Sequence, residues 1–377
     1  MRAAHETGAL RMTSSATRRL VINGRFLGRP ATGVDRFAFE TVRAIDALLS
    51  AEDRIVAGLK VELVAPAHAG RSHSPFAHIP LRTAGHGRGT CWEQLSLPFV
   101  ANGSLLLNLC NSGPIVYRRQ VTVLHDAAPV RVPQSYSRAF SAWYRCMAPT
   151  IGRVARRIVT VSEFARTELC EAYGIQASKI GVVSESGEHM LRVQAARNHP
   201  CRGQKRPYVL AVGSRNQHKN FRLVAEAARL MVGAPFDIVV VGGSDPRVYG
   251  EEQDALPSFV RHLGYVSDAD LGALYRDAAC FVFPSRYEGF GLPPVEAMAL
   301  GCPVVASRLP STVEVCGDAV LYFSPDDPRE LAEVLHRVTS DSALRERMRK
   351  NGYARSAQLT WRATAVRLLE EVLPWLN

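Results

Sequence analysis

The sequence of 377 residues predicts an α/β protein with two doubly wound, Rossmann-like domains that face each other across a cleft. Short runs rich in β-branched residues alternate with longer helical patterns along the chain, which is typical of parallel sheets covered by helices on both faces. One polar stretch, residues 199–207, separates two such series. The length is also sufficient for two domains that each bury a core.

Each series contains six expected strands. In the first series they lie at residues 20–23, 61–66, 104–110, 121–126, 158–162 and 180–184. In the second series they lie at residues 208–214, 236–243, 260–266, 280–285, 302–307 and 319–324. We therefore expect one domain over residues 18–200 and a second over 201–360. Doubly wound sheets bind ligands beyond the carboxyl ends of their strands, so the loops after these strands should line the cleft.

The composition predicts a soluble protein of the cytoplasm. Apolar residues make up 47% and charged residues 21% of the chain, as in ordinary globular domains. The longest apolar runs are far shorter than the roughly eighteen residues that span a bilayer. The first 19 residues lack the apolar core of a secretory signal.

Charge, cysteines and histidines limit the classes of partner and cofactor. The net charge of +11 favours anionic partners, namely nucleic acid, anionic lipid or a phosphorylated substrate, although solubility alone is the alternative explanation. Eight cysteines without a CxxC pair predict reduced thiols. No metal site is expected, because the loop histidines lack partners at metal-ligand spacing; they are His68, His73, His78 and His86.

The most informative stretch is residues 284–303, which read PSRYEGFGLPPVEAMALGCP. An apolar strand passes through a turn containing Gly289 and Gly291 into an apolar helix, and such a turn exposes backbone N–H groups to an anion. Glu288 and Glu296 stand on either side with seven residues between them. Carboxylates suit neutral hydroxyls rather than phosphate, so the pattern predicts a ligand that carries both, such as a sugar nucleotide.

In its EGFGLPPVEAMALGCPVV context, this glutamate pair resembles the signature of the retaining glycosyltransferases of family 4, which have the GT-B fold. The resemblance extends over roughly residues 18–377. It implies a nucleotide-sugar donor as co-substrate, no other cofactor and no metal. It also implies that a terminal helix at about residues 361–377 packs back on the first domain.

The resemblance assigns roles to the residues of this signature. Glu288 would contact the donor sugar, and Glu296 would bind the ribose hydroxyls of the nucleotide. The backbone N–H groups that follow Gly289 would meet phosphate and sugar oxygens; they belong to Phe290, Gly291 and Leu292. For Glu296 an alternative remains open, because a glutamate in the first turn of a helix is favoured by the helix dipole alone.

The loop at 214–220 offers cations for the departing nucleoside diphosphate. Lys219 matches the family pattern, and Arg215 is the candidate for a second phosphate-binding role, while His218 stands where arginine is common. Preorganised cations at this place would stabilise the developing negative charge. The alternative is that both residues are solvated charges at a helix start. By the same resemblance, backbone at Gly264 and Val266 borders the nucleotide base.

The first domain contributes its own candidates. His125 and Asp126 follow a strand, and the resemblance directs the histidine towards the donor sugar, with the aspartate orienting it or the acceptor. Gly33 heads a helix and is similar to the family's first glycine loop, where glycine allows close approach. Ser162 matches a family position, but it also suits a helix N-cap without any other role.

The resemblance suggests a retaining glycosyltransferase with little covalent help from the protein. The segment VVSESGEHM at 182–190 departs from the family's usual Asn-Gly-Val pattern and is similar to members that act on bacterial surface polysaccharide. We therefore expect a hexosyltransferase that transfers mannose from GDP-mannose to a lipid-linked oligosaccharide or polysaccharide precursor. The alternatives are a sugar-nucleotide epimerase of the same architecture and, less favoured, a nucleic-acid-binding protein.

The segment 136–157 combines aromatic residues with arginines, which would suit peripheral binding to an anionic membrane on its inner face. The arginines are Arg145, Arg153, Arg156 and Arg157. The alternative is an ordinary covering helix with solvated arginines. Asp268 and Asp270 are similar to the metal-binding pair of another glycosyltransferase class, but first-turn acids of a helix explain them better.

Overall fold

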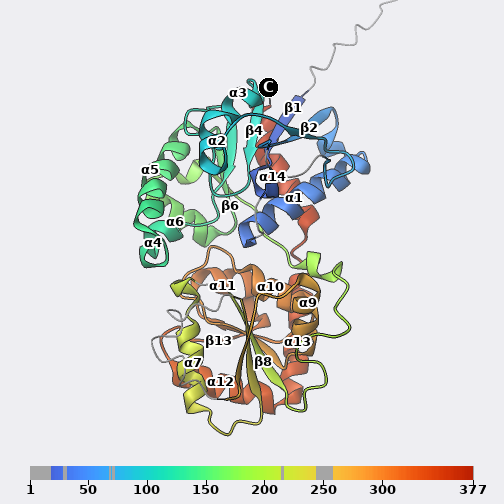
Figure 1. Ribbon diagram of the computed structural model, residues 1–377, viewed down its shortest axis with the longest axis vertical. Helices are drawn as coiled ribbons and strands as arrows, with labels where there is room; N and C mark the ends of the chain where they lie inside the picture. Colours follow the sequence, from blue (N-terminus) through green and yellow to red (C-terminus); the bar gives the residue numbers. More distant parts are fainter. Residues whose placement is uncertain are drawn as a thin grey trace, which may run out of the picture.

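The computed structural model describes residues 18–28, 32–67, 69, 73–213, 216–242 and 258–376. Over these ranges, thirteen strands form two sheets in which every recorded pair of neighbours is parallel. The strand orders are β3-β2-β1-β4-β5-β6-β7 and β10-β9-β8-β11-β12-β13. Each sheet belongs to one of two lobes stacked along the long axis of the molecule (Figure 1). The predicted fold class, two doubly wound domains, is confirmed.

The first sheet comprises β1 (Arg18–Asn23), β2 (Leu59–Ala65), β3 (Leu81–Thr83), β4 (Leu105–Asn108), β5 (Gln120–Val123), β6 (Arg157–Thr160) and β7 (Ile180–Val182). Its α-helices are α1 (Gly33–Ser50), α2 (Gly89–Leu95), α3 (Leu97–Ala101), α4 (Ala128–Arg131), α5 (Arg138–Val154) and α6 (Glu163–Tyr173). The central strands β4 and β5 are buried along their whole length, as expected for strands covered on both faces. The short edge strand β3 was not predicted, because an exposed three-residue strand carries no readable alternation.

The second sheet comprises β8 (Tyr208–Gly213), β9 (Asp237–Gly242), β10 (Val260–Gly264), β11 (Cys280–Phe283), β12 (Val304–Ser307) and β13 (Leu321–Phe323). The helices around it are α7 (Phe221–Leu230), α9 (Asp268–Asp277), α10 (Leu292–Ala299), α11 (Pro310–Cys316), α12 (Pro328–Ser340) and α13 (Ser342–Ser356). Helix starts follow local capping chemistry. Ser267, for example, accepts a hydrogen bond from the backbone of Asp270 at the start of α9.

The last helix, α14 (Trp361–Val372), leaves the second lobe and packs on α1 of the first lobe (Figure 1). Thr360 caps its first turn. The hydroxyl of Thr364 donates to the carbonyl of Ser184 at 2.6 Å, and Arg157 pairs with Glu371 at 2.6 Å. The chain therefore passes between the lobes twice, once after β7 and once before α14.

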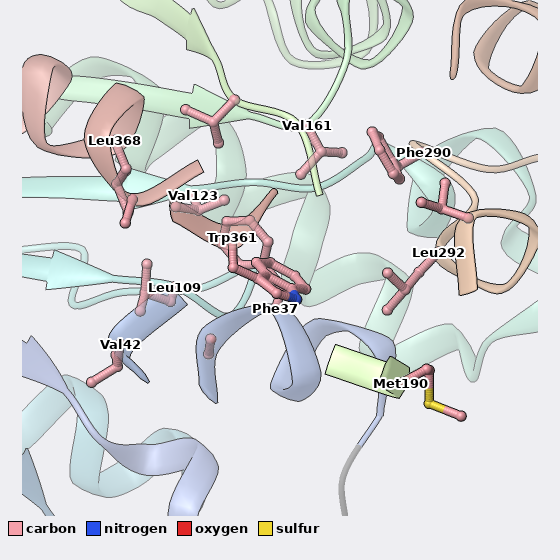
Figure 2. Close-up of a cluster of buried hydrophobic side chains, with 14 of the residues drawn as sticks. Phe37, Val42, Leu109, Val123, Val161, Met190, Phe290, Leu292, Trp361 and Leu368 are labelled. Atoms are coloured by element: carbon pink, nitrogen blue, oxygen red, sulfur yellow. The ribbon is translucent and has the colours of Figure 1, made fainter. Parts of the chain in front are cut away.

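A single apolar cluster joins the two lobes. Figure 2 shows Phe37 of α1 beside Trp361 of α14, with Phe290 and Leu292 of the second lobe in the same cluster. The rings of Phe37 and Trp361 meet edge to face, with centroids 6.0 Å apart. Residues of both lobes remove apolar surface from water in this cluster, and this burial stabilises the closed arrangement of the lobes.

Cysteines and helices bear on two of the sequence expectations. All eight cysteines are free thiols, and five of them are buried, including Cys280 and Cys302. Burial raises the pKa of Cys280 to about 12, so this thiol stays protonated and unreactive. Within the described part of the chain, none of the helices combines the length and apolarity needed to span a membrane.

Candidate active site

Predicted residues from both lobes meet where the carboxyl ends of the two sheets face each other. His125 and Asp126 follow β5, and Gly289 follows β11. A methyl group at Gly289 would overlap the carbonyl oxygen of His125 and lie 3.0 Å from Cβ of Asp126. The hydroxyl of Ser162, after β6, donates to the carbonyl of Gly289 at 2.5 Å. Glycine is needed here because backbone of one lobe touches backbone of the other.

The charged centre of this site is an ion pair within the second lobe. Lys219 Nζ lies 2.7 Å from Glu288 Oε1, and the two side chains are 19% and 13% exposed. Lys219 ends a short 3₁₀ helix, η6 (Gln217–Lys219), just before α7. The same loop carries His218, whose pKa is lowered to about 4 by burial and by the charge of Lys219. His218 is therefore neutral at physiological pH.

Asp126 adds a second carboxylate from the first lobe. Its side chain accepts a hydrogen bond from the backbone of Ala128 at 2.9 Å. Burial raises the pKa of Asp126, and the charge of Glu288 raises it further. The hydrogen bond from the backbone N–H of Ala128 lowers this pKa, as do the positive charges of His125 and Lys219. Asp126 of the first lobe is therefore close enough to the Lys219–Glu288 pair of the second lobe to be influenced by both charges.

His125 is buried, with both ring nitrogens facing hydrogen-bond acceptors. Nδ1 lies 3.1 Å from Glu185 Oε1, and Nε2 lies 3.0 Å from the carbonyl oxygen of Leu109. Burial alone disfavours the imidazolium, but the hydrogen bond and charge of Glu185 outweigh it and raise the pKa of His125. Because neither neighbour can donate a proton, both nitrogens donate only when the ring is charged. The edge of Phe37 packs on this ring, with centroids 4.7 Å apart.

Glu296 lies deeper in the site than its position in the sequence suggested. It is the fifth residue of α10, in the second turn, and not in the first turn as expected. Glu296 as a whole is 8% exposed. Its carboxylate lies 3.0 Å from His189 Nε2 and accepts a hydrogen bond from the hydroxyl of Tyr275 at 3.4 Å. The helix dipole acts mainly at the first turn, so it does not account for this glutamate.

The turn before α10 depends on a glycine in a left-handed conformation. Gly291 adopts φ 99° and ψ 63°, a left-handed conformation that other residues rarely take. Leu292 then opens the helix with proline in the first turn. The N–H of Leu292, the first residue of α10, lacks an intrahelical acceptor, whereas Phe290 and Gly291 precede the helix; all three residues are buried, and the role of their N–H groups towards phosphate or sugar oxygens stays a prediction.

The remaining predicted residues lie around this centre. Gly33 is the first residue of α1, and a methyl group there would meet no atom within 4 Å. Gly264 ends β10 with φ 67°, while Val266 packs against the main apolar cluster. Arg215 lies outside the described residues. Asp270 takes part in capping α9, and Asp268 pairs with Arg36 of α1 across the lobes. These contacts account for both aspartates without a metal ion.

Residues that sequence reasoning missed hold the two lobes together. The carboxylate of Glu314 on α11 accepts hydrogen bonds from the backbone of Glu163 and Phe164 at 2.7 and 3.0 Å, and so occupies the start of α6. The hydroxyl of Tyr287 accepts from the backbone of Ala127 at 3.1 Å. No local pattern marks these contacts. Glu185 and His189 lie in the segment that departs from the family pattern, a signal that could have identified them.

Two further expectations concern metal and membrane. Across the residues that the structure describes, no group of three or more His, Cys, Asp or Glu side chains is arranged to hold a metal ion. On and after α5, Arg145, Arg153 and Arg156 are exposed. Arg157 pairs instead with Glu371 of α14. The expected basic face therefore loses this fourth arginine to a structural ion pair.

Comparison with known proteins identifies relatives of both the sequence and the fold. Residues 194–355 match the family described as Glycosyl transferases group 1. The O-antigen chain mannosyltransferase B of Escherichia coli is 30% identical over 259 residues, which cover 64% of this chain and 67% of the relative. The chain thus matches about two thirds of that relative's length.

Two solved structures resemble the whole arrangement of lobes. The sucrose-phosphate synthase of Thermosynechococcus elongatus has a TM-score of 0.71 at 20% identity, covering 93% of this chain and 97% of that chain. HepE of Anabaena, in complex with UDP and glucose, has a TM-score of 0.66 at 18% identity, covering 94% and 99%. At such low identity these likenesses establish the fold alone.

Proposed function

The chain belongs to the glycosyl transferases of group 1, and from that premise we propose that it is a retaining hexosyltransferase of family 4. The observation that carries the proposal is the junction of the lobes, where the turn before α10 lies against His125 and beside the Lys219–Glu288 pair. This junction combines backbone N–H groups, a cation and carboxylates. A diphosphate joined to a sugar needs all three kinds of partner.

In the proposed transfer, the protein binds and orients the donor and stabilises the charge that develops on it. Lys219 turns from Glu288 towards the diphosphate as negative charge grows on the departing oxygen. Glu288 is then free to accept hydrogen bonds from sugar hydroxyls. The bond from the anomeric carbon to the phosphate oxygen breaks while the bond to the acceptor oxygen forms on the same face. The acceptor's proton passes to the departing phosphate oxygen, so no protein nucleophile and no metal take part.

The proposed donor is GDP-mannose, and the proposed acceptor is a lipid-linked oligosaccharide or polysaccharide precursor. Support comes from the O-antigen chain mannosyltransferase B of Escherichia coli, which has 30% identity to this chain. The segment 182–190, with its departure from the common family pattern, is the feature of the chain that agrees with this choice.

Thermal-shift measurements against a panel of sugar nucleotides test the donor, because a ligand that binds only the folded state raises Tm. The expected result is stabilisation by GDP-mannose above that by UDP-glucose. Transfer is then followed with radiolabelled GDP-mannose and a membrane fraction that contains lipid-linked acceptors. Stabilisation by none of the sugar nucleotides would refute the proposal, and conversion of the donor to an epimer without acceptor would favour the epimerase.

We further propose that α5 brings the enzyme to an anionic membrane surface, where a lipid-linked acceptor would lie. Exposed Arg145, Arg153 and Arg156 supply positive charge, and Phe140, 41% exposed, supplies an apolar contact. Flotation with liposomes that contain anionic lipid should recover the protein, and neutral liposomes should not. Equal failure to float with both lipid compositions contradicts this role for α5.

A further inference from the structure

The segment 184–189, Ser-Glu-Ser-Gly-Glu-His, is a connector between β7 and the second lobe that contacts both lobes and α14. Its residues are mostly buried, including the polar side chains of Glu185, Ser186 and His189. The hydroxyl of Ser186 donates to the carbonyl of Leu359 at 2.6 Å. A surface linker would expose such groups to water, so the burial of this connector requires another explanation.

At its first end the connector holds His125 of the first lobe. Glu185 Oε1 lies 3.1 Å from Nδ1 of the ring, and Glu185 is 5% exposed. With Leu109 on the other nitrogen, this carboxylate fixes the orientation of the imidazole and favours its charged form. Removal of Glu185 would leave Nδ1 without its acceptor and would weaken the preference of the ring for its charged form, although Leu109 and Phe37 would still contact the ring.

At its other end the connector holds Glu296 of the second lobe. His189 Nε2 lies 3.0 Å from Glu296 Oε1, and the indole N–H of Trp361 donates to His189 Nδ1 at 3.3 Å. An ionised carboxylate only accepts hydrogen bonds, so Nε2 of His189 donates to Glu296. Nδ1 accepts from the indole in the neutral ring, and the carbonyl of Ser186, 3.3 Å from Nδ1, accepts from this nitrogen only when the ring is charged.

Between these two ends, the backbone of the connector presses on the backbone of α10. A methyl group at Gly187 would overlap the carbonyl oxygen of Val295 and lie 2.7 Å from the backbone nitrogen of Glu296. Gly187 has φ −93°, so close approach, and not backbone conformation, requires glycine there. The connector therefore fixes both the backbone and the carboxylate of Glu296.

We propose that Glu185 and His189 are positioning residues. They act through His125 and Glu296 to hold the two halves of the donor site in a fixed arrangement. This inference rests on the proposed function, because it assigns His125 to the sugar and Glu296 to the nucleotide. Its consequence is a division of effects. Loss of His189 should weaken nucleotide binding, whereas loss of Glu185 should slow turnover.

The first test measures binding of GDP and UDP by calorimetry and steady-state kinetics with GDP-mannose for wild type and His189→Leu. The expected result is a rise in Kd and donor KM on the order of 10-fold, as for a buried carboxylate that loses its partner, with kcat nearly unchanged. His189→Gln, which can still donate to Glu296, should restore most of the affinity. A His189→Leu variant with wild-type affinity would overturn the inference.

A double-mutant cycle separates positioning from mere stability. If His189 acts through Glu296, then His189→Leu should add nothing to the loss of affinity already caused by Glu296→Ala. Additive losses would contradict the inference, even where Tm falls in each variant. Gly187→Ala supplies an independent perturbation of Glu296 and should raise KM in the same direction; an unchanged KM would count against the connector's role.

The second half of the test concerns Glu185. Glu185→Leu should lower kcat on the order of 10-fold with little change in donor KM, and Glu185→Gln, whose amide oxygen can accept from Nδ1, should recover part of it. A Glu185→Leu effect confined to Tm would overturn its positioning role. If wild type binds neither nucleotide and transfers no sugar, the proposed function fails, and this inference fails with it.

Discussion

Replacement of Lys219 by alanine gives the sharpest test of the site, because the structure separates its effects on folding and on catalysis. In the folded protein its ammonium lies 2.7 Å from Glu288 and its charge lowers the pKa of Asp126. Without it, two neighbouring carboxylates remain in a largely buried place. We expect a loss of about 1–3 kcal/mol in the free energy of unfolding, the usual cost of a buried polar group without its partner.

Turnover should fall further than stability explains. Loss of one preorganised group that stabilises developing charge lowers kcat roughly 10²–10³-fold. The double variant K219A/E288Q replaces one of the two carboxylates by a neutral amide and so removes their repulsion; it should regain most of the folding stability but none of the activity. Urea unfolding and steady-state kinetics measure the two effects separately, and Lys350→Ala, at an exposed position of α13, is the matched control.

One result would refute the reasoning: near-normal turnover of Lys219→Ala with an intact fold. Recovery of activity in K219A/E288Q would also contradict it, since activity would then depend on stability and not on the cation. A loss of turnover in Lys350→Ala of the same size would show that the effect is not specific to the site.

Three other predictions concern Gly289, Glu314 and His218. Gly289→Ala should push the lobes apart at the carbonyl of His125, lowering both Tm and kcat/KM; an unchanged Tm would show that the lobes do not meet there in solution. Glu314→Ala should free the start of α6 and increase the radius of gyration by small-angle X-ray scattering, with no increase counting against a closed resting state. The pKa of His218 is about 4 in the folded protein and about 6.5 in the unfolded chain. As pH falls below 6.5 the unfolded state gains the proton first, so unfolding free energy should drop by about 2 kcal/mol from pH 7 to pH 5 through this group. His218→Gln should remove that part of the pH dependence in urea unfolding, and an unchanged slope would contradict the assignment.

The fold could be predicted to a large extent because its signals are local. All twelve expected strands occur, with ends that differ by a few residues, since an apolar β-branched run bounded by turn residues carries its own evidence. The short strand β3 was missed because its pairing with β2 supplies the order that its three residues lack. Glu296 was expected in the first turn of α10 and lies in the second, because α10 begins at Leu292, directly after the left-handed Gly291 and before the two prolines.

The sequence by itself determined the two lobes, the placement of candidate site residues in the loops after the strands, and the glycine-rich turn between the paired glutamates. Only the tertiary structure decided which polar groups meet. Glu185 reaches His125 across 60 residues, His189 reaches Glu296 across 107, and Ser162 reaches Gly289 across 127. Periodicity reports the contacts of a residue with its near neighbours in the chain. A hydrogen bond between distant segments depends on how the strands of a sheet and the two lobes are arranged, and no local pattern encodes that arrangement.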